Sequence, residues 1–246
     1  MCTLTILRES NRLLVTMNRD DIAERQEAPP AHWPNAQPAF VAPRDLQAGG
    51  TWIGVNGHGV VACLLNRYDA APVGRMSRGS IVIEAMRGST IEAARNALAG
   101  LDHGAFSPFT CLVIGQSSAM RLDWTGGRLE HGDLPATDNN IMVTSSSWQF
   151  DKVKAQREAL FQEIWSNGGD AAGNVATFHA QRVNARDAWA PMMQRPQSET
   201  KSVTQVELSS LGAEMRYWTR DAAIDRRLTF PATSIRLGCD GRVGAK

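Results

Sequence analysis

The chain has 246 residues, of which 43% are hydrophobic and 21% are charged, as is ordinary for a globular protein. Its net charge of +1 gives no electrostatic reason to expect a nucleic-acid or membrane partner. No apolar run approaches the ~20 residues that span a bilayer, and the first apolar stretch ends at Arg8-Glu9, too early for a signal peptide.

The cysteines indicate a reducing compartment. The four of them are spread along the chain, and their spacing fits neither a disulfide framework nor a metal-binding knuckle. They are Cys2, Cys63, Cys111 and Cys239. We therefore expect reduced thiols in a cytoplasmic protein.

The N-terminal segment predicts a β-hairpin, with strands at 4–7 and 13–17 on either side of a polar connection. Both strands are apolar on both faces, which is typical of a sheet covered on each side. The following stretch, 20–43, is rich in proline and contains Trp33 and Phe40. We expect it to be an irregular excursion that forms the wall or lid of a pocket.

The rest of the chain alternates between strand and helix patterns. A second hairpin is expected at 51–55 and 60–65, and the capping box Ser89-Thr90-Ile91-Glu92 begins a helix. Further strands are predicted at 109–114, 119–124, 128–131, 141–144, 202–208 and 215–218, and two more helices are predicted after Asp151 and Asn174. This order favours a single α+β domain over residues 1–246, with helices layered against antiparallel sheets.

Cys2 is the residue with the most distinctive chemistry, because it directly follows Met1. Removal of the initiator methionine would leave it with a thiol of pKa ~8.5 and a free α-amine of pKa ~8. One residue would then hold a nucleophile and the base that activates it, as in N-terminal nucleophile catalysis. The alternative is that Cys2 is a buried strand residue without a chemical role.

Five motifs follow one another along the first part of the chain. They are Asn18-Arg19-Asp20-Asp21, Ala42-Pro43-Arg44-Asp45-Leu46, Gly49-Gly50-Thr51-Trp52-Ile53-Gly54-Val55-Asn56, Leu64-Leu65-Asn66-Arg67 and Ser77-Arg78-Gly79. In this order they resemble the NRDE family, known in animals as the transport and Golgi organisation family. The resemblance is strong over residues 1–80 and weaker afterwards. It implies a four-layer αββα sandwich of the N-terminal nucleophile hydrolase type, with mainly antiparallel sheets.

The resemblance also implies roles for particular residues. The wider fold group includes penicillin V acylases and choloylglycine hydrolases, which begin Met-Cys and use an aspartate to hold the amine of the cysteine. Asp20 matches that aspartate, and Asn66 matches an asparagine that donates to the oxyanion. An aspartate beside an α-amine favours its protonated form, and a preorganised amide donor stabilises an oxyanion by about 3–4 kcal/mol.

The chain also departs from those hydrolases. Ser145 stands where a second asparagine is expected, and Thr16 or Met17 stands where they carry an arginine. Arg19 lies nearby but out of register, and Lys201 is a loose match to a late arginine. The candidate catalytic set is therefore Cys2, Arg19, Asp20, Asn66 and Ser145. Structural alternatives remain open, with Arg19 and Asp20 as an ion pair and Asn66 as a turn residue.

Two functions follow from this resemblance. The first is a cysteine hydrolase that cleaves a non-peptide C–N amide bond of a small molecule, without a cofactor. The second is a non-catalytic carrier related to haem or lipid trafficking, in which Cys2 or a pocket histidine ligates iron. We expect no metal site, because the five histidines lack ligand spacing, and we expect a monomer or homodimer.

Overall fold

The computed structural model describes residues 2–68, 70, 74–134, 139–182 and 188–238. One sheet has six strands, in the spatial order β10 (Asn140–Ser145), β1 (Cys2–Arg8), β2 (Arg12–Asp21), β11 (Glu199–Ser209), β12 (Gly212–Thr219) and β13 (Thr233–Leu237). The other has seven, in the order β3 (Glu27–His32), β4 (Phe40–Asp45), β5 (Ile53–Asn56), β6 (Val61–Asn66), β7 (Phe109–Ile114), β8 (Ala119–Trp124) and β9 (Leu129–Leu134). All neighbouring strands are antiparallel.

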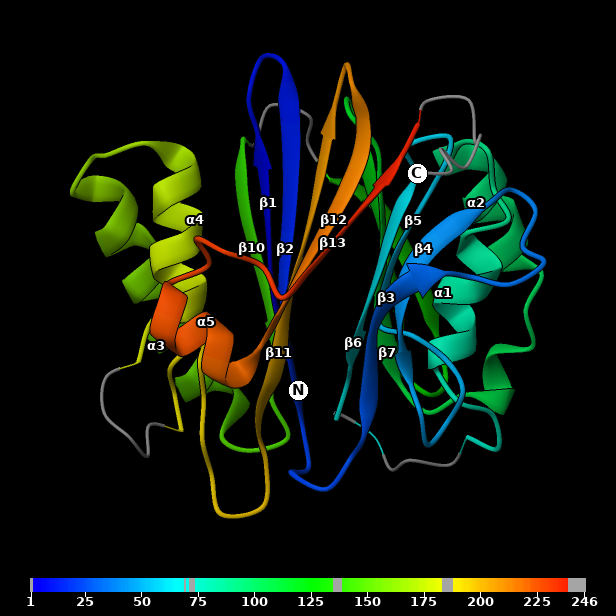
Figure 1. Ribbon diagram of the computed structural model, residues 1–246. Helices are drawn as coiled ribbons and strands as arrows, with labels where there is room; N and C mark the ends of the chain where they lie inside the picture. The colour runs from blue at the N-terminus through cyan, green and yellow to red at the C-terminus, as the bar shows by residue number, and fades with distance from the viewer. Residues whose placement is uncertain (1, 69, 71–73, 135–138, 183–187, 239–246) are drawn as a thin grey trace.

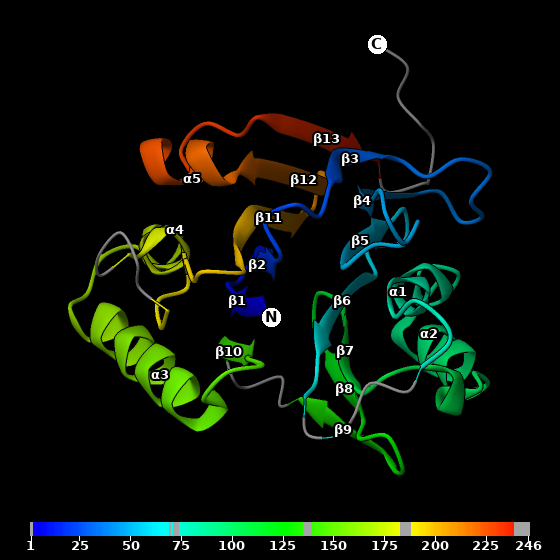
Figure 2. The ribbon, with the colours of Figure 1, turned by 90° about the horizontal axis from the view of Figure 1, so that it is seen from below.

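The helices cover the outer faces of both sheets. They are α1 (Gly79–Ala85), α2 (Ile91–Ala99), α3 (Phe150–Ser166), α4 (Ala171–Ala180) and α5 (Arg220–Arg226), with a short 3-10 turn at His103–Ala105. The helices α3, α4 and α5 lie on the six-stranded sheet, and α1 and α2 lie on the seven-stranded sheet (Figures 1 and 2). The chain thus folds into the four-layer αββα sandwich that the sequence predicts.

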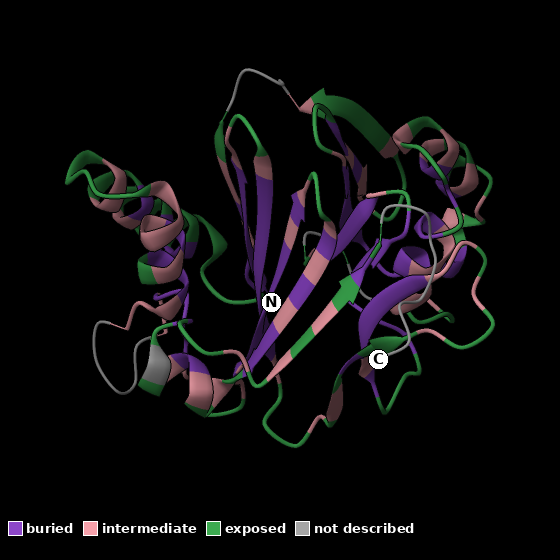
Figure 3. Cartoon of the chain, turned by 45° about the horizontal axis from the view of Figure 1, so that its top comes forward, coloured by how far each residue is buried: buried purple, intermediate pink, exposed green. Residues whose placement is uncertain are grey.

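The main core lies between the two sheets. Side chains alternate along β1 and β2, so Leu4 and Val15 point inward and meet Ile53 and Val61 of the facing sheet. The helix-facing side of the six-stranded sheet is also buried but is much more polar. Its buried residues include Thr16, Asn18 and Asp20. Figure 3 shows this burial along the central strands. The apolar and polar faces are therefore both covered, as expected of interior strands.

The prediction of an irregular 20–43 segment is wrong in part. It contains the strand β3 and the start of β4. Strand β3 tolerates Pro29 and Pro30 because it lies at the edge of its sheet, where its register with β4 shifts between Ala28 and Ala31. Prolines that suggest a loop in sequence are thus compatible with an edge strand.

The predicted helices differ from the structure at several points. Helix α3 begins before the expected cap Asp151, with Gln149 as its N-cap, and α5 was not predicted. The helix expected to begin at Asn174 begins earlier, because the Asp170 side chain accepts a hydrogen bond from the Gly173 N–H and caps α4. The short helix α1 was not predicted, since its run Ile81-Val82-Ile83 is β-branched and its N-cap makes no side-chain bond. Within the described residues, no helix combines the length and apolar character needed to cross a membrane.

Candidate active site

Cys2 lies at the head of β1, at the end of the sandwich where several strand ends meet. It is paired with Arg19 of β2 on one side and with Ser145 of β10 on the other. Its side chain points between the sheets, is 6% exposed and lines a cavity of about 380 Å³. The predicted site residues Arg19, Asp20 and Asn66 line the same cavity. The structure therefore brings four of the five candidates together around one space.

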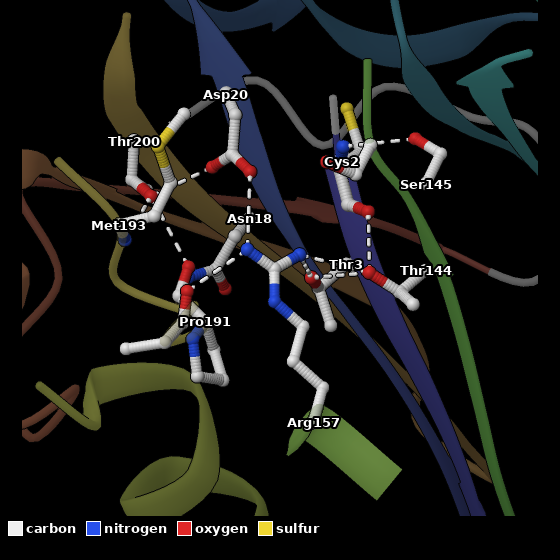
Figure 4. Close-up of polar contacts among 12 residues, drawn as sticks. Cys2, Thr3, Asn18, Asp20, Thr144, Ser145, Arg157, Pro191, Met193 and Thr200 are labelled. Carbon is white, nitrogen blue, oxygen red and sulfur yellow. Dashed lines mark hydrogen bonds and ion pairs between the residues drawn. The ribbon is translucent and has the colours of Figure 1, made fainter. Parts of the chain in front are cut away.

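Ser145 is the fifth candidate, and it contacts the backbone nitrogen of Cys2. The Cys2 N–H donates to Ser145 Oγ at 3.1 Å (Figure 4). The pairing of β1 with β10 produces this contact, because it places the two residues opposite each other. Ser145 thus contacts the nitrogen that would become the α-amine if Met1 were removed.

Asp20 lies at the end of β2 and is almost fully enclosed. Its Oδ1 accepts a hydrogen bond from Thr200 Oγ1 at 2.6 Å, and its Oδ2 lies 3.8 Å from the Arg157 guanidinium. Burial raises the pKa of the Asp20 carboxyl, and the Arg157 charge and the Thr200 hydrogen bond oppose that rise. The Asp20 carboxylate also raises the pKa of the Cys2 thiol, so the two groups are electrostatically coupled.

Arg157 of α3 is the main site residue that the sequence did not reveal. Its guanidinium donates to the carbonyls of Trp189 and Ala190, each at 2.9 Å, and to the hydroxyls of Thr3 and Thr144 (Figure 4). Its side chain is 1% exposed. Arg157 therefore joins α3, the head of β1, β10 and the segment before β11 around Asp20.

Asn18 reinforces the same arrangement from β2. Its amide donates to the carbonyls of His179 and Pro191, at 3.0 and 2.9 Å, and its oxygen contacts the His179 ring. Burial lowers the pKa of His179 to about 3, with a further contribution from Arg157. His179 is therefore a neutral structural residue at physiological pH, and its ring also bonds Thr5 Oγ1 at 2.8 Å.

Arg19 is held by several groups at once. Its guanidinium lies 2.6 Å from Glu27, 2.9 Å from Asp21 and 3.3 Å from Asp45. It also stacks over the Trp52 ring, 4.4 Å from the ring centroid. This positive charge lowers the pKa of the Cys2 thiol, but burial has the larger effect and the thiol pKa is raised overall. Cys2 therefore needs a proton acceptor to react as a thiolate at neutral pH.

Asn66 stands at the end of β6 and is shared by two adjoining hollows. One is the Cys2 cavity, and the other is a groove of about 470 Å³ whose walls include Ser145 and Phe150. Within the described residues its side-chain amide has no hydrogen-bond partner. The amide is therefore free to donate to a ligand that lies between the two hollows.

Lys201, the loose match to a late arginine, contacts groups other than Asp20. Lys201 lies in a bulge of β11, where its amino group donates to the Ala23 carbonyl and pairs with Glu199 at 3.5 Å. The buried cation beside Asp20 is Arg157. The carrier hypothesis has Cys2 or a pocket histidine as a ligand of iron. The described walls of the Cys2 cavity contain no histidine, so Cys2 is the one thiolate or imidazole ligand that they offer.

The layers and the site together define the class of protein. Two antiparallel sheets between helices, with a cysteine heading an inner strand, form the fold of the N-terminal nucleophile hydrolases. The family model for Transport and Golgi organisation 2 matches residues 1–224, and the chain belongs to that family. This confirms the resemblance seen in the motifs.

Solved structures support the fold. A Caenorhabditis elegans ortholog of N-acylethanolamine-hydrolyzing acid amidase matches with a TM-score of 0.57 and 12% identity, covering 96% of this chain and 100% of that one. A mutant of conjugated bile acid hydrolase from Clostridium perfringens matches with a TM-score of 0.51 and 9% identity, covering 90% and 93%. A comparison with curated proteins finds no significant match. At these identities the likeness establishes the fold alone.

Proposed function

We propose that this protein is an N-terminal cysteine amidohydrolase that cleaves a non-peptide C–N amide bond of a small molecule. The observation that carries the proposal is the placement of Cys2. Its thiol lines a cavity between the sheets, its nitrogen is held by Ser145 at 3.1 Å, and Asp20 and Asn66 line the same cavity, the Asn66 amide without a partner among the described residues. A nucleophile, an adjacent base and an oxyanion donor are what acyl transfer requires.

The proposed reaction begins once Met1 is removed and Cys2 has a free α-amine. The amine takes the thiol proton, Sγ attacks the amide carbon, and the carbonyl oxygen becomes an oxyanion that accepts a hydrogen bond from Asn66. The C–N bond then breaks, and the ammonium returns the proton to the leaving nitrogen. Water hydrolyses the resulting thioester, which releases the acid and restores the thiol. Ser145 and Asp20 position the amine throughout.

The raised pKa of the Cys2 thiol supports this sequence of proton transfers. A buried thiol gives little thiolate at neutral pH by itself, so a base within the same residue has a clear use. The names of the structural relatives agree with the class of reaction, since one is an amidase and the other a bile acid hydrolase. The substrate itself is not specified by these likenesses.

A panel of acylated amines tests the proposal. Wild-type protein, with Met1 removal checked by intact mass, should release amine from at least one member, and Cys2→Ala should lower kcat by at least about 1,000-fold. Cys63→Ala is the matched control, because Cys63 is a buried core cysteine that does not line the cavity. Equal turnover by wild type and Cys2→Ala would refute the mechanism.

A further inference from the structure

Arg78 belongs to a motif to which the proposed reaction gives no role. The motif Ser77-Arg78-Gly79 begins α1 and forms part of the wall of the Cys2 cavity. Backbone packing fixes its position, because a Cβ built on Gly50 would lie 2.7 Å from the Gly79 Cα and carbonyl carbon. The Thr51 N–H also donates to the Gly79 carbonyl at 3.3 Å. Two motifs that are distant in sequence therefore meet and place Arg78 at the cavity.

The ion pairs of the cavity wall join other residues than Arg78. Asp45 pairs with Arg25 at 2.7 Å and with Arg19 at 3.3 Å. Asp21 likewise pairs with Arg19 at 2.9 Å and with Arg25 at 3.4 Å. In the part of the chain that the structure describes, no carboxylate forms an ion pair with Arg78.

Among the described residues, Arg78 has one hydrogen-bond acceptor, the Pro108 carbonyl, which receives a hydrogen bond from Nη1 at 2.9 Å. A guanidinium has five N–H donors in a planar fork, so most of its donors remain available to a ligand. Burial lowers the pKa of Arg78, and the nearby Tyr68, Cys2 and Asp21 oppose this effect. An arginine stays protonated in proteins, so its partial desolvation has a cost that an anionic ligand would offset.

We propose that the substrate carries a carboxylate that binds to Arg78 when its amide bond lies at Cys2. The substrate class is then an N-acyl compound with an acidic group, and Arg78 is the residue that selects it. This inference rests on the proposed function in one respect, namely that the bound anion is a substrate. The preference for an anion beside Cys2 is independent of turnover and is measurable without it. A bidentate guanidinium–carboxylate pair supplies the specificity.

The test compares two alkylating agents of similar size, iodoacetate and iodoacetamide, at Cys2. Both react with the thiolate, so the ratio of their rates cancels the thiolate fraction and reports attraction of the carboxylate. We expect this ratio, measured by peptide mass spectrometry at low salt, to fall about threefold to fivefold in Arg78→Gln, as for a partly exposed ion pair. Arg78→Lys should retain part of the preference, because it keeps the charge.

Arg87→Gln is the matched control. It removes the same charge from the residue after the C-cap of α1, where the Arg87 side chain is 67% exposed, and should leave the ratio unchanged. Cys63 and Cys111 are fully buried and should stay unalkylated in every folded variant. An unchanged ratio in a folded Arg78→Gln protein would overturn the inference.

A second measurement decides the question if Arg78→Gln does not fold. Butyrate should protect wild-type Cys2 from iodoacetamide at concentrations at least threefold lower than butyramide, and equal protection would overturn the inference. Failure of the proposed function has a different outcome. In that case the anion preference persists while no N-acyl carboxylate is cleaved.

Discussion

Replacement of Arg157 by glutamine should reveal how the protein stabilises the carboxylate at its candidate active site. The substitution removes the cation that lies 3.8 Å from Asp20 and the hydrogen bonds that Arg157 donates to the Trp189 and Ala190 carbonyls. Breaking a buried ion pair by removal of one partner costs about 3–5 kcal/mol. At about 2–4 °C per kcal/mol for a chain of this size, Tm should fall by about 10 °C.

The loss should also depend on pH. The folded-state pKa of Asp20 is raised, so this group's contribution to stability is present below its unfolded pKa, ~3.9, and is lost as pH rises through the folded value. Removal of Arg157 raises the folded pKa further and adds to the loss at neutral pH. The difference in unfolding free energy between wild type and Arg157→Gln should therefore be larger at pH 7 than at pH 5.

Urea unfolding at the two pH values measures both effects. Lys154→Gln is the matched control on the same helix, because Lys154 is half exposed and pairs only at the surface with Glu158. It should change the unfolding free energy by less than about 0.5 kcal/mol. A destabilisation below about 1 kcal/mol in Arg157→Gln, or one that is equal at pH 5 and pH 7, would refute the reasoning.

Three further predictions concern His179, Gly50 and Cys2. The pKa of His179 is lowered to about 3, so stability should fall from pH ~6.5 downward by up to about 1.4 kcal/mol per pH unit, and urea titrations of His179→Gln should lack this contribution. Gly50→Ala forces a Cβ against the Gly79 backbone and should cost about 1–3 kcal/mol by thermal unfolding, whereas Gly127→Ala, with open space around it, should cost under about 0.5. The alkylation rate of Cys2 should still rise above pH 9, because its thiol pKa is raised, and a plateau below pH 9 would contradict the burial described here.

Much of the fold is predictable from local patterns. The hairpin of β1 and β2 follows from two apolar runs around a polar connection, and β7 and β8 have the bounds predicted from their sequence patterns. The edge strand β3 is not predictable in this way, because its prolines favour a loop and only its place at the sheet edge permits pairing.

In the candidate site, too, some residues are predictable from the sequence and others depend on tertiary packing. Cys2 and Asp20 are found from their positions in the first hairpin and from the family resemblance. The buried role of Arg157 depends on long-range packing, which places α3 against β10 and the segment 188–193. One signal was present, because Arg157 lies four residues from both Val153 and Phe161 on the buried stripe of α3. An arginine on such a stripe indicates a buried polar partner.

The account depends on a covalent bond between the acyl group and Cys2. The direct measurement is mass spectrometry of the N-terminal peptide after acid quenching of protein mixed with an N-acyl carboxylate that it cleaves. We predict a peptide that begins at Cys2 and carries the mass of the acyl group on its sulfur. A peptide that still begins at Met1, or an unmodified Cys2 during turnover, would contradict the account.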